Sequence, residues 1–195
     1  MVELYVSEIL SRTSEEKAFI MLLQEKDGMR KLPVMIGPFE AQSIVFAKRN
    51  IQFERPTTHD LFKLFAEACD TKLLHAKIDR IVEGTFFSYL LFTNGEKEIK
   101  LDARTSDAVA IAMRYGAPVY IEDELLNTLC VKEEWDNAIS IPITLAATEM
   151  LREVMQRAIK DENYELAMKL KKEIDARTAK KEGNNDPVTT TETNN

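Results

Sequence analysis

Two stretches of strand-like sequence, each followed by a helical pattern, constrain the fold of this chain more than any other feature. Residues 2–36 contain three short aliphatic runs, and an Asp27-Gly28 turn signal lies between the last two. Residues 73–103 repeat the arrangement, and their Asn94-Gly95 dipeptide is typical of a tight β-hairpin. Successive strands joined by short turns pair antiparallel. The sequence therefore predicts two antiparallel strand meanders.

Three other segments have the periodicity of helices. They are predicted over residues 38–50, 57–70 and 106–115. The second begins with Thr57 and Asp60 at capping-box spacing. We expect Thr105 to cap the third helix, which Gly116 stops. Helices packed on strand meanders define an α+β domain, predicted over residues 1–140.

The last fifty residues have a different composition. Two amphipathic helical patterns follow one another, with a break at residues 161–163. Their apolar stripes contain Leu151, Val154, Met155, Ala158 and Ile159, then Ala167, Leu170 and Ile174. We expect a small α-helical hairpin over residues 146–180, which is too short to be stable without packing on something else. Residues 181–195 contain almost nothing apolar and are predicted to be a disordered tail.

Charge and apolar run length exclude two classes of protein. The formal net charge is -7, which argues against sequence-independent coating of nucleic acid, because that requires a positive surface. The apolar runs are far shorter than the roughly 20 residues that span a bilayer, and no basic and apolar leader begins the chain. We expect a cytoplasmic protein with no membrane contact. Cys69 and Cys130 lack partners at metal-binding or redox spacing, so we expect buried reduced thiols.

Polar residues gather at the three predicted helix starts, where unpaired amides favour phosphate or carboxylate groups. They include Glu40, His59, Asp60, Asp102, Arg104 and Asp107. If these ends converge on one cleft, the carboxylates can bind Mg²⁺ or Mn²⁺, which polarises a phosphate and activates water. His59 can then accept a proton, and Arg104 can stabilise the developing charge.

Each of these side chains also has a purely structural interpretation. Asp60 can serve only the capping box, and Asp107 can serve only the dipole of its helix. Glu40 can cap its own helix, and Asp102 can form an ion pair with Arg104. The residues by themselves leave both interpretations open.

Three segments resemble the bifunctional nuclease domain family. They read LPVMIGPFEAQSIVFA, RPTTHDLFKLF and LDARTSDAVAIAMRYGAPVYI, and the resemblance covers about residues 2–130. Thr105 stands where the family often has proline. The resemblance implies an α+β domain that cleaves DNA and RNA. It makes His59, Asp60, Asp102, Arg104, Ser106 and Asp107 catalytic candidates, and Glu40, Asp60, Asp102 and Asp107 candidate ligands for Mg²⁺ or Mn²⁺.

The segment LREVMQRAIKDENYELAMKLKKEIDAR resembles the UVR motif of the excision-repair proteins UvrB and UvrC. That resemblance implies a hairpin that docks on a protein partner or on a second copy of the chain, as in a homo-oligomer. The leading hypothesis is a nuclease acting on DNA or RNA. The alternatives are a non-catalytic regulator or adaptor that acts through the hairpin, and a protein whose cleft binds a small anionic metabolite.

Overall fold

The computed structural model describes residues 1–11, 18–131 and 148–183 of the chain. The chain divides into two compact units, Met1–Leu145 and Ala146–Asn195. The predicted end of the body near residue 140 and residues 184–195 of the predicted tail lie outside the described residues. The α+β class with a C-terminal helical pair is confirmed.

Seven strands of the first unit form one sheet, in the order β3-β2-β1-β7-β4-β5-β6. They are β1 (Val2–Ser11), β2 (Phe19–Glu25), β3 (Lys31–Ile36), β4 (Lys72–Val82), β5 (Thr85–Thr93), β6 (Glu98–Arg104) and β7 (Val119–Ile121). Both predicted meanders are present, as β1 to β3 and β4 to β6. Strand β7 joins them, because it pairs antiparallel with β1 and parallel with β4.

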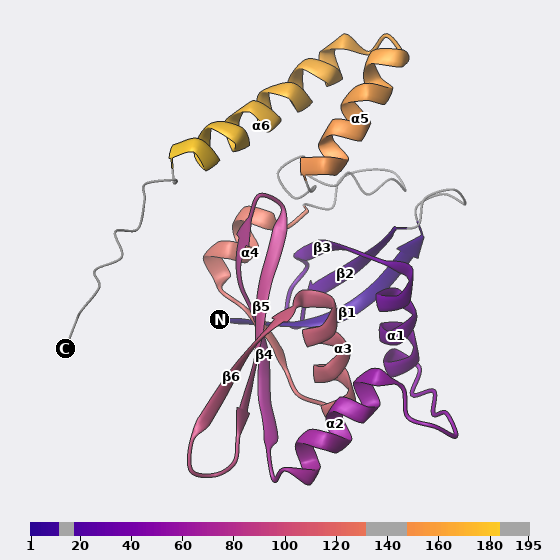
Figure 1. Ribbon diagram of the computed structural model, residues 1–195, viewed down its shortest axis with the longest axis vertical. Coiled ribbons are helices and arrows are strands. Elements are labelled where there is room, and N and C mark those ends of the chain that lie inside the picture. Colours follow the sequence, from indigo (N-terminus) through magenta and orange to yellow (C-terminus); the bar gives the residue numbers. More distant parts are fainter. Residues whose placement is uncertain (12–17, 132–147, 184–195) are drawn as a thin grey trace, which may run out of the picture. The chain divides into compact units, whose positions relative to one another are not determined.

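Three helices pack together over one face of this sheet (Figure 1). They are α1 (Pro38–Lys48), α2 (Thr58–Ala68) and α3 (Thr105–Tyr115), and a fourth helix, α4 (Asp123–Leu129), follows β7. Residues 108–112 of α3 are all buried, and three of the five are alanines, so the helix can approach its neighbours closely. Gly116 ends α3 in the left-handed conformation with φ of 63°, as predicted.

Two local predictions within the first unit are wrong. Thr105 is the first residue of α3 and not its cap, which is Arg104. The Thr105 hydroxyl is buried 2.6 Å from that of Ser88, so it ties the helix to strand β5. The two cysteines are free thiols, but Cys69 is exposed and Cys130 is only partly buried.

The two halves of the sheet differ in how their second face is covered. In β2 the four consecutive residues 20–23 are buried, so both faces are covered there. In β5 only alternate residues are buried, and these are Ser88, Leu90 and Phe92. Phe87 and Tyr89 point to the other side and are half-buried. The β4 to β6 half therefore has an accessible face opposite the helices.

The second unit contains α5 (Thr148–Lys160) and α6 (Tyr164–Gly183), which form the predicted hairpin. Leu151 and Ala158 of α5 and Ala167, Leu170 and Ile174 of α6 are buried. Helix α6 continues to Gly183, so residues 181–183, which we predicted to be disordered, are helical. Among the described helices, none combines the length and the apolar character needed to cross a bilayer.

Candidate functional site

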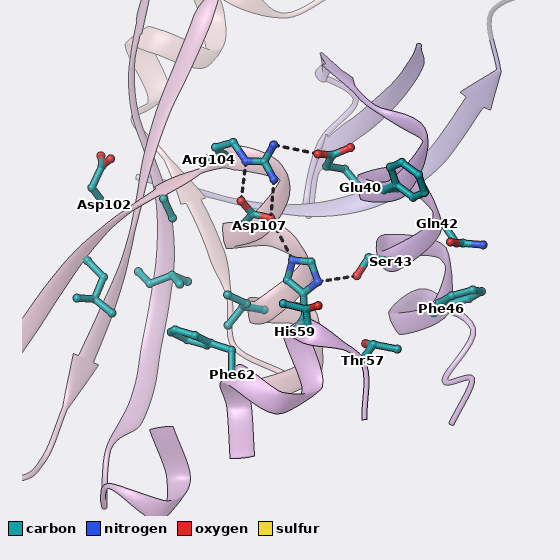
Figure 2. A pocket seen from close by; sticks show the side chains of 16 residues that line it. Glu40, Gln42, Ser43, Phe46, Thr57, His59, Phe62, Asp102, Arg104 and Asp107 are labelled. Carbon is teal, nitrogen blue, oxygen red and sulfur yellow. Dashed lines mark hydrogen bonds and ion pairs between the residues drawn. The ribbon is translucent and has the colours of Figure 1, made fainter. Parts of the chain in front are cut away.

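A cleft of about 800 Å³ opens between α1, α2, β6 and the start of α3. Five of the residues predicted for the site line it: Glu40, His59, Asp102, Arg104 and Asp107. Two others do not: Asp60 lies outside the cleft lining, and Ser106 is buried. Most of the candidate residues at the three helix starts therefore lie around one cleft. Figure 2 shows how their side chains lie.

His59 lies at the centre of the cleft wall, in the first turn of α2. Its Nδ1 atom is 2.9 Å from the Ser43 hydroxyl of α1, and its Nε2 atom is 3.1 Å from Oδ1 of Asp107 in α3. The imidazole is 18% exposed and Asp107 27% exposed, so both can be reached from solvent. Three helices thus each contribute one residue to a Ser-His-Asp arrangement.

Arg104 lies at the outer end of this arrangement, at the mouth of the cleft. Its Nε donates to Oδ2 of Asp107 at 2.8 Å, and its two terminal nitrogens donate to Oδ1 of Asp107 at 3.3 Å and to Oε1 of Glu40 at 2.9 Å. A guanidinium has five N–H groups, and three are used here, so two remain. The Arg104 side chain is 67% exposed and is paired with Glu40 and Asp107, not with Asp102.

Arg114 lies at the inner end, where its side chain is only 8% exposed. Its Nε donates to Oδ1 of Asp60 at 2.5 Å, and a terminal nitrogen donates to the Ser43 hydroxyl at 3.2 Å. Asp60 also accepts from the Thr57 amide at 2.9 Å, which is the predicted capping box. Asp60 therefore holds α2 and Arg114 in place and does not face the cleft.

These contacts form one continuous polar network. Its members, in order, are Asp60, Arg114, Ser43, His59, Asp107, Arg104 and Glu40. Ser43 and Arg114 were not among the residues predicted for the site. A helical signal for both exists: Ser43 follows Glu40 by three residues, and Arg114 follows Asp107 by seven, so each lies on the same helix face as a residue that was selected.

The surroundings set the charge states of two carboxylates. Burial alone would raise the pKa of Asp107, but hydrogen bonds from Arg104 and His59 outweigh it, so the pKa lies below its usual value. Burial would likewise raise the pKa of Asp60, and hydrogen bonds from Thr57 and Arg114 lower it. Hydrogen bonding to Asp107 raises the pKa of Arg104, with a smaller contribution from Glu40.

The network also indicates the tautomer of the neutral histidine. Because Asp107 is ionised at neutral pH, it is purely an acceptor, and His59 Nε2 must donate to it. Arg114 donates to the Ser43 oxygen, which leaves the Ser43 hydrogen free to point at Nδ1. We assign from these partners the tautomer in which Nε2 carries the hydrogen and Nδ1 accepts.

The four predicted metal ligands are not gathered into one ligand set. Glu40 and Asp107 are both held by Arg104, and Asp60 is held by Arg114. Asp102 projects from β6 away from the other carboxylates (Figure 2). Within residues 1–11, 18–131 and 148–183 no group of three or more His, Cys, Asp or Glu side chains is arranged to hold a metal ion. The carboxylates as placed therefore do not fit a preformed Mg²⁺ or Mn²⁺ site.

An α+β body with a polar cleft at three helix starts is the architecture that these observations define. A model of the bifunctional nuclease domain matches residues 21–134, which contain every member of the polar network. The chain belongs to the bifunctional nuclease domain family. The predicted resemblance to this family is confirmed, whereas the likeness of the hairpin to the UVR motif stays a prediction.

Several proteins are similar to this chain over most or part of its length. An uncharacterized protein of Mycobacterium tuberculosis (strain ATCC 25618 / H37Rv) is 34% identical over 145 residues, which cover 73% of this chain and 87% of the relative. Bifunctional nuclease 1 of Oryza sativa subsp. japonica is 28% identical over 113 residues, 56% of this chain and 34% of the relative. Bifunctional nuclease 1 of Arabidopsis thaliana is 21% identical over 165 residues, 81% of this chain and 50% of the relative. This chain thus spans half or less of these two plant proteins.

Proposed function

We propose that the chain is a nuclease that hydrolyses phosphodiester bonds of DNA or RNA in the cleft between α1, α2 and α3. The observation that carries the proposal is the arrangement of His59 between Ser43 and Asp107, next to an exposed guanidinium with N–H groups to spare. Membership of the family and the names of the plant relatives support the same class of substrate.

Arg104 is the residue that binds the phosphate. Its two remaining N–H groups can donate to the non-bridging oxygens of a phosphodiester, and its charge opposes the charge that grows on them during attack. Glu40 and Asp107 fix the plane of the guanidinium before the substrate arrives, so little side-chain entropy is lost on binding.

His59 acts as general base through Ser43. Because both ring nitrogens already have partners, a water in the cleft can reach the imidazole only through the Ser43 hydroxyl. The water gives a proton to the Ser43 oxygen while Ser43 passes its own proton to Nδ1. The resulting hydroxide attacks phosphorus, the bond to the leaving oxygen breaks, and that oxygen takes a proton from solvent, while His59 afterwards returns its proton to solvent through Ser43. Asp107 stabilises the imidazolium that forms.

We also propose that the α5–α6 hairpin docks on a protein partner or on a second copy of the chain. Ile159, Tyr164 and Met168 are 49%, 62% and 73% exposed, although each is apolar or aromatic. This exposed surface also favours the second candidate function, a non-catalytic adaptor that acts through the hairpin. The homo-oligomer and the cytoplasmic location stay predictions from the sequence.

A cleavage assay with the full-length protein tests the hydrolytic proposal. Labelled DNA and RNA are incubated with Mg²⁺, with Mn²⁺ and with a chelator. We expect cleavage by the unchanged protein and a fall in kcat of about 10²- to 10⁴-fold in His59→Ala. Ser43→Ala should lose only about tenfold, because a water can occupy the place of the hydroxyl and contact Nδ1 directly.

Glu67→Ala is the matched control, since Glu67 is exposed on the same helix as His59 and lies outside the cleft lining. Its kcat should equal that of the unchanged protein. If His59→Ala and Ser43→Ala cleave normally, the reaction does not occur in this cleft. If the unchanged protein cleaves no substrate under any of these conditions, the hydrolytic proposal is overturned and the adaptor function is preferred.

A further inference from the structure

The accessible face of strands β4, β5 and β6, opposite the helices, combines aromatic rings with cations. The strand register places Arg80 of β4 and Arg104 of β6 on either side of Phe87. On the next rung, Lys77 and Asp102 lie on either side of Tyr89. The rung after that carries Lys100 of β6. Lys77, Arg80 and Lys100 thus share this face with the two rings, and Lys77 is paired with Glu122.

Two of the cations, Arg80 and Lys100, lie directly over the rings. The Arg80 guanidinium carbon is 4.5 Å from the centre of the Phe87 ring, and the Lys100 ammonium is 3.8 Å from the centre of the Tyr89 ring. Both cationic side chains are exposed, and both rings are half-buried. Arg80 also contacts Asp79 at 2.9 Å, an exposed pair of the kind that contributes little to stability. These long side chains can therefore move to a ligand and leave the ring faces accessible.

This surface is continuous with the cleft. A hollow of about 280 Å³ lies on it, and its lining contains the two rings, the cations Arg80 and Lys100, and the acids Asp79 and Asp102. Asp102 lines both this hollow and the cleft. Arg104 completes the first rung, and its guanidinium turns into the cleft to contact Asp107 and Glu40. A ligand that crosses the edge strand β6 therefore passes from the rings to the guanidinium that we assign to phosphate binding.

We propose that this ring-and-cation face, defined by Arg80, Phe87, Tyr89 and Lys100, binds single-stranded DNA or RNA and leads the strand over β6 into the cleft. The inference rests on the proposed function, for which it specifies the form of the substrate. Bases stack on the two rings, which are two residues apart on one strand and so about 6.8 Å apart. Phosphates contact Arg80 and Lys100. In a duplex the bases are stacked on each other, so their faces cannot reach the rings.

The charge distribution favours this occupant. The chain as a whole carries a formal net charge of -7, so a polyanion is repelled by most of its surface. The ring-and-cation face concentrates basic side chains beside aromatic rings, which is the combination that single-stranded nucleic acid requires. A local contact of this kind agrees with the exclusion of sequence-independent coating.

Binding is measured by fluorescence anisotropy on the full-length protein carrying His59→Ala, which should prevent cleavage. The probes are a labelled oligothymidylate, an oligouridylate and a DNA duplex of equal length. We expect Tyr89→Ala to weaken binding of both single strands about tenfold and Tyr89→Phe to retain it, because the phenylalanine keeps the ring. Arg80→Ala should reduce the slope of log affinity against log salt concentration by about one, which corresponds to one phosphate contact.

Tyr5→Ala is the matched control, since Tyr5 is an exposed tyrosine of β1 in the other half of the sheet, and its affinity should be unchanged. Arg80 is an exposed side chain, so Arg80→Ala still tests the inference if Tyr89→Ala does not fold. In the protein with His59 intact, Tyr89→Ala should raise KM for the oligonucleotide and leave turnover of bis(p-nitrophenyl) phosphate, which is too short to reach the rings, unchanged.

The outcomes separate this inference from the proposed function. If the enzyme cleaves nucleic acid but Tyr89→Ala and Arg80→Ala bind single strands normally, the inference is overturned and the hydrolytic function stands. The same holds if the duplex binds as tightly as the single strands. If single strands bind through Tyr89 and Arg80 but nothing is cleaved, the binding face stands and the hydrolytic function fails.

Discussion

Two arginines at opposite ends of the polar network contact the same kinds of partner in opposite surroundings. Arg104 at the outer end pairs with Asp107 and Glu40 and is 67% exposed. Arg114 at the inner end pairs with Asp60 and is 8% exposed. Burial and the number of donors already in use, rather than residue type, therefore decide whether an arginine here is structural or available to a ligand.

The inner arginine uses its donors within the protein. Besides Asp60, it donates to the main-chain oxygens of Ala110 and Ser43 and to the Ser43 hydroxyl. It thus joins α1, α2 and α3 where they pack together. The outer arginine has three N–H groups in use, two with Asp107 and one with Glu40, and two remain. We therefore expect the two ends to respond to the same substitution in different measurements.

The largest expected effect is on activity at the outer end. Arg104→Ala should lower kcat about 10²- to 10³-fold, because it removes the donors that we propose stabilise the charge of the transition state. Its free energy of unfolding should change by no more than about 0.5 kcal/mol, since the side chain is exposed. Steady-state cleavage and urea unfolding measure the two quantities. Arg152→Ala in the hairpin, also an exposed arginine, should change neither. A strongly destabilised Arg104→Ala would contradict the comparison.

The next effect is on stability at the inner end. Arg114→Leu should lower the free energy of unfolding by about 3 kcal/mol, because a buried ion pair loses one partner. This loss lies at the lower end of the range for a buried ion pair that loses one partner, since Asp60 is 37% exposed and keeps its contacts to Thr57. Urea unfolding of Arg114→Leu beside Arg104→Leu gives the direct comparison. Equal stability of the two variants would mean that burial does not distinguish the two ends.

Most of the fold could be predicted because its signals are local. The turns at Asp27-Gly28 and Asn94-Gly95 separate strands, and Gly116 ends α3, each through the conformations that these residues favour. A short strand at residues 118–121 could be predicted and is present as β7, but its position in the sheet could not be predicted from its own sequence. Its pairing with β1 and β4 depends on contacts between residues far apart along the chain.

The candidate site was predictable only in part, for the same reason. Glu40, His59 and Asp107 stand at helix starts, where a polar residue has a recognised use, and the structure joins them. Ser43 and Arg114 lie within helices, where a polar residue usually faces solvent, and only the packing of α1, α2 and α3 turns them toward His59 and Asp60. Asp102 and Ser106 belong to the same motif, but Asp102 lies away from the other carboxylates and Ser106 is buried.

Acidification should reduce the stability that both ends of the network contribute. This effect should be smaller than those of the Arg104 and Arg114 substitutions. The pKa of Asp107 and that of Asp60 lie below the ordinary value of 3.8. A carboxyl with a lowered folded-state pKa contributes stability above its unfolded value, and that contribution is lost as the pH falls through the folded value. The loss of unfolding free energy on going below pH 3.8 should therefore be reduced in Asp107→Asn, which cannot titrate there.

The difference should be about 0.2–1 kcal/mol, the range of a partly exposed ion pair, in urea unfolding measured above and below pH 3.8. Glu96→Gln is the control, because Glu96 is an exposed residue of the turn between β5 and β6, and its pH dependence should match that of the unchanged protein. If Asp107→Asn loses as much stability on acidification as the unchanged protein, then Arg104 and His59 do not hold Asp107 as an ionised partner. The outer end would then lack the fixed charge that orients His59, and the contrast between the two arginines would rest on burial alone.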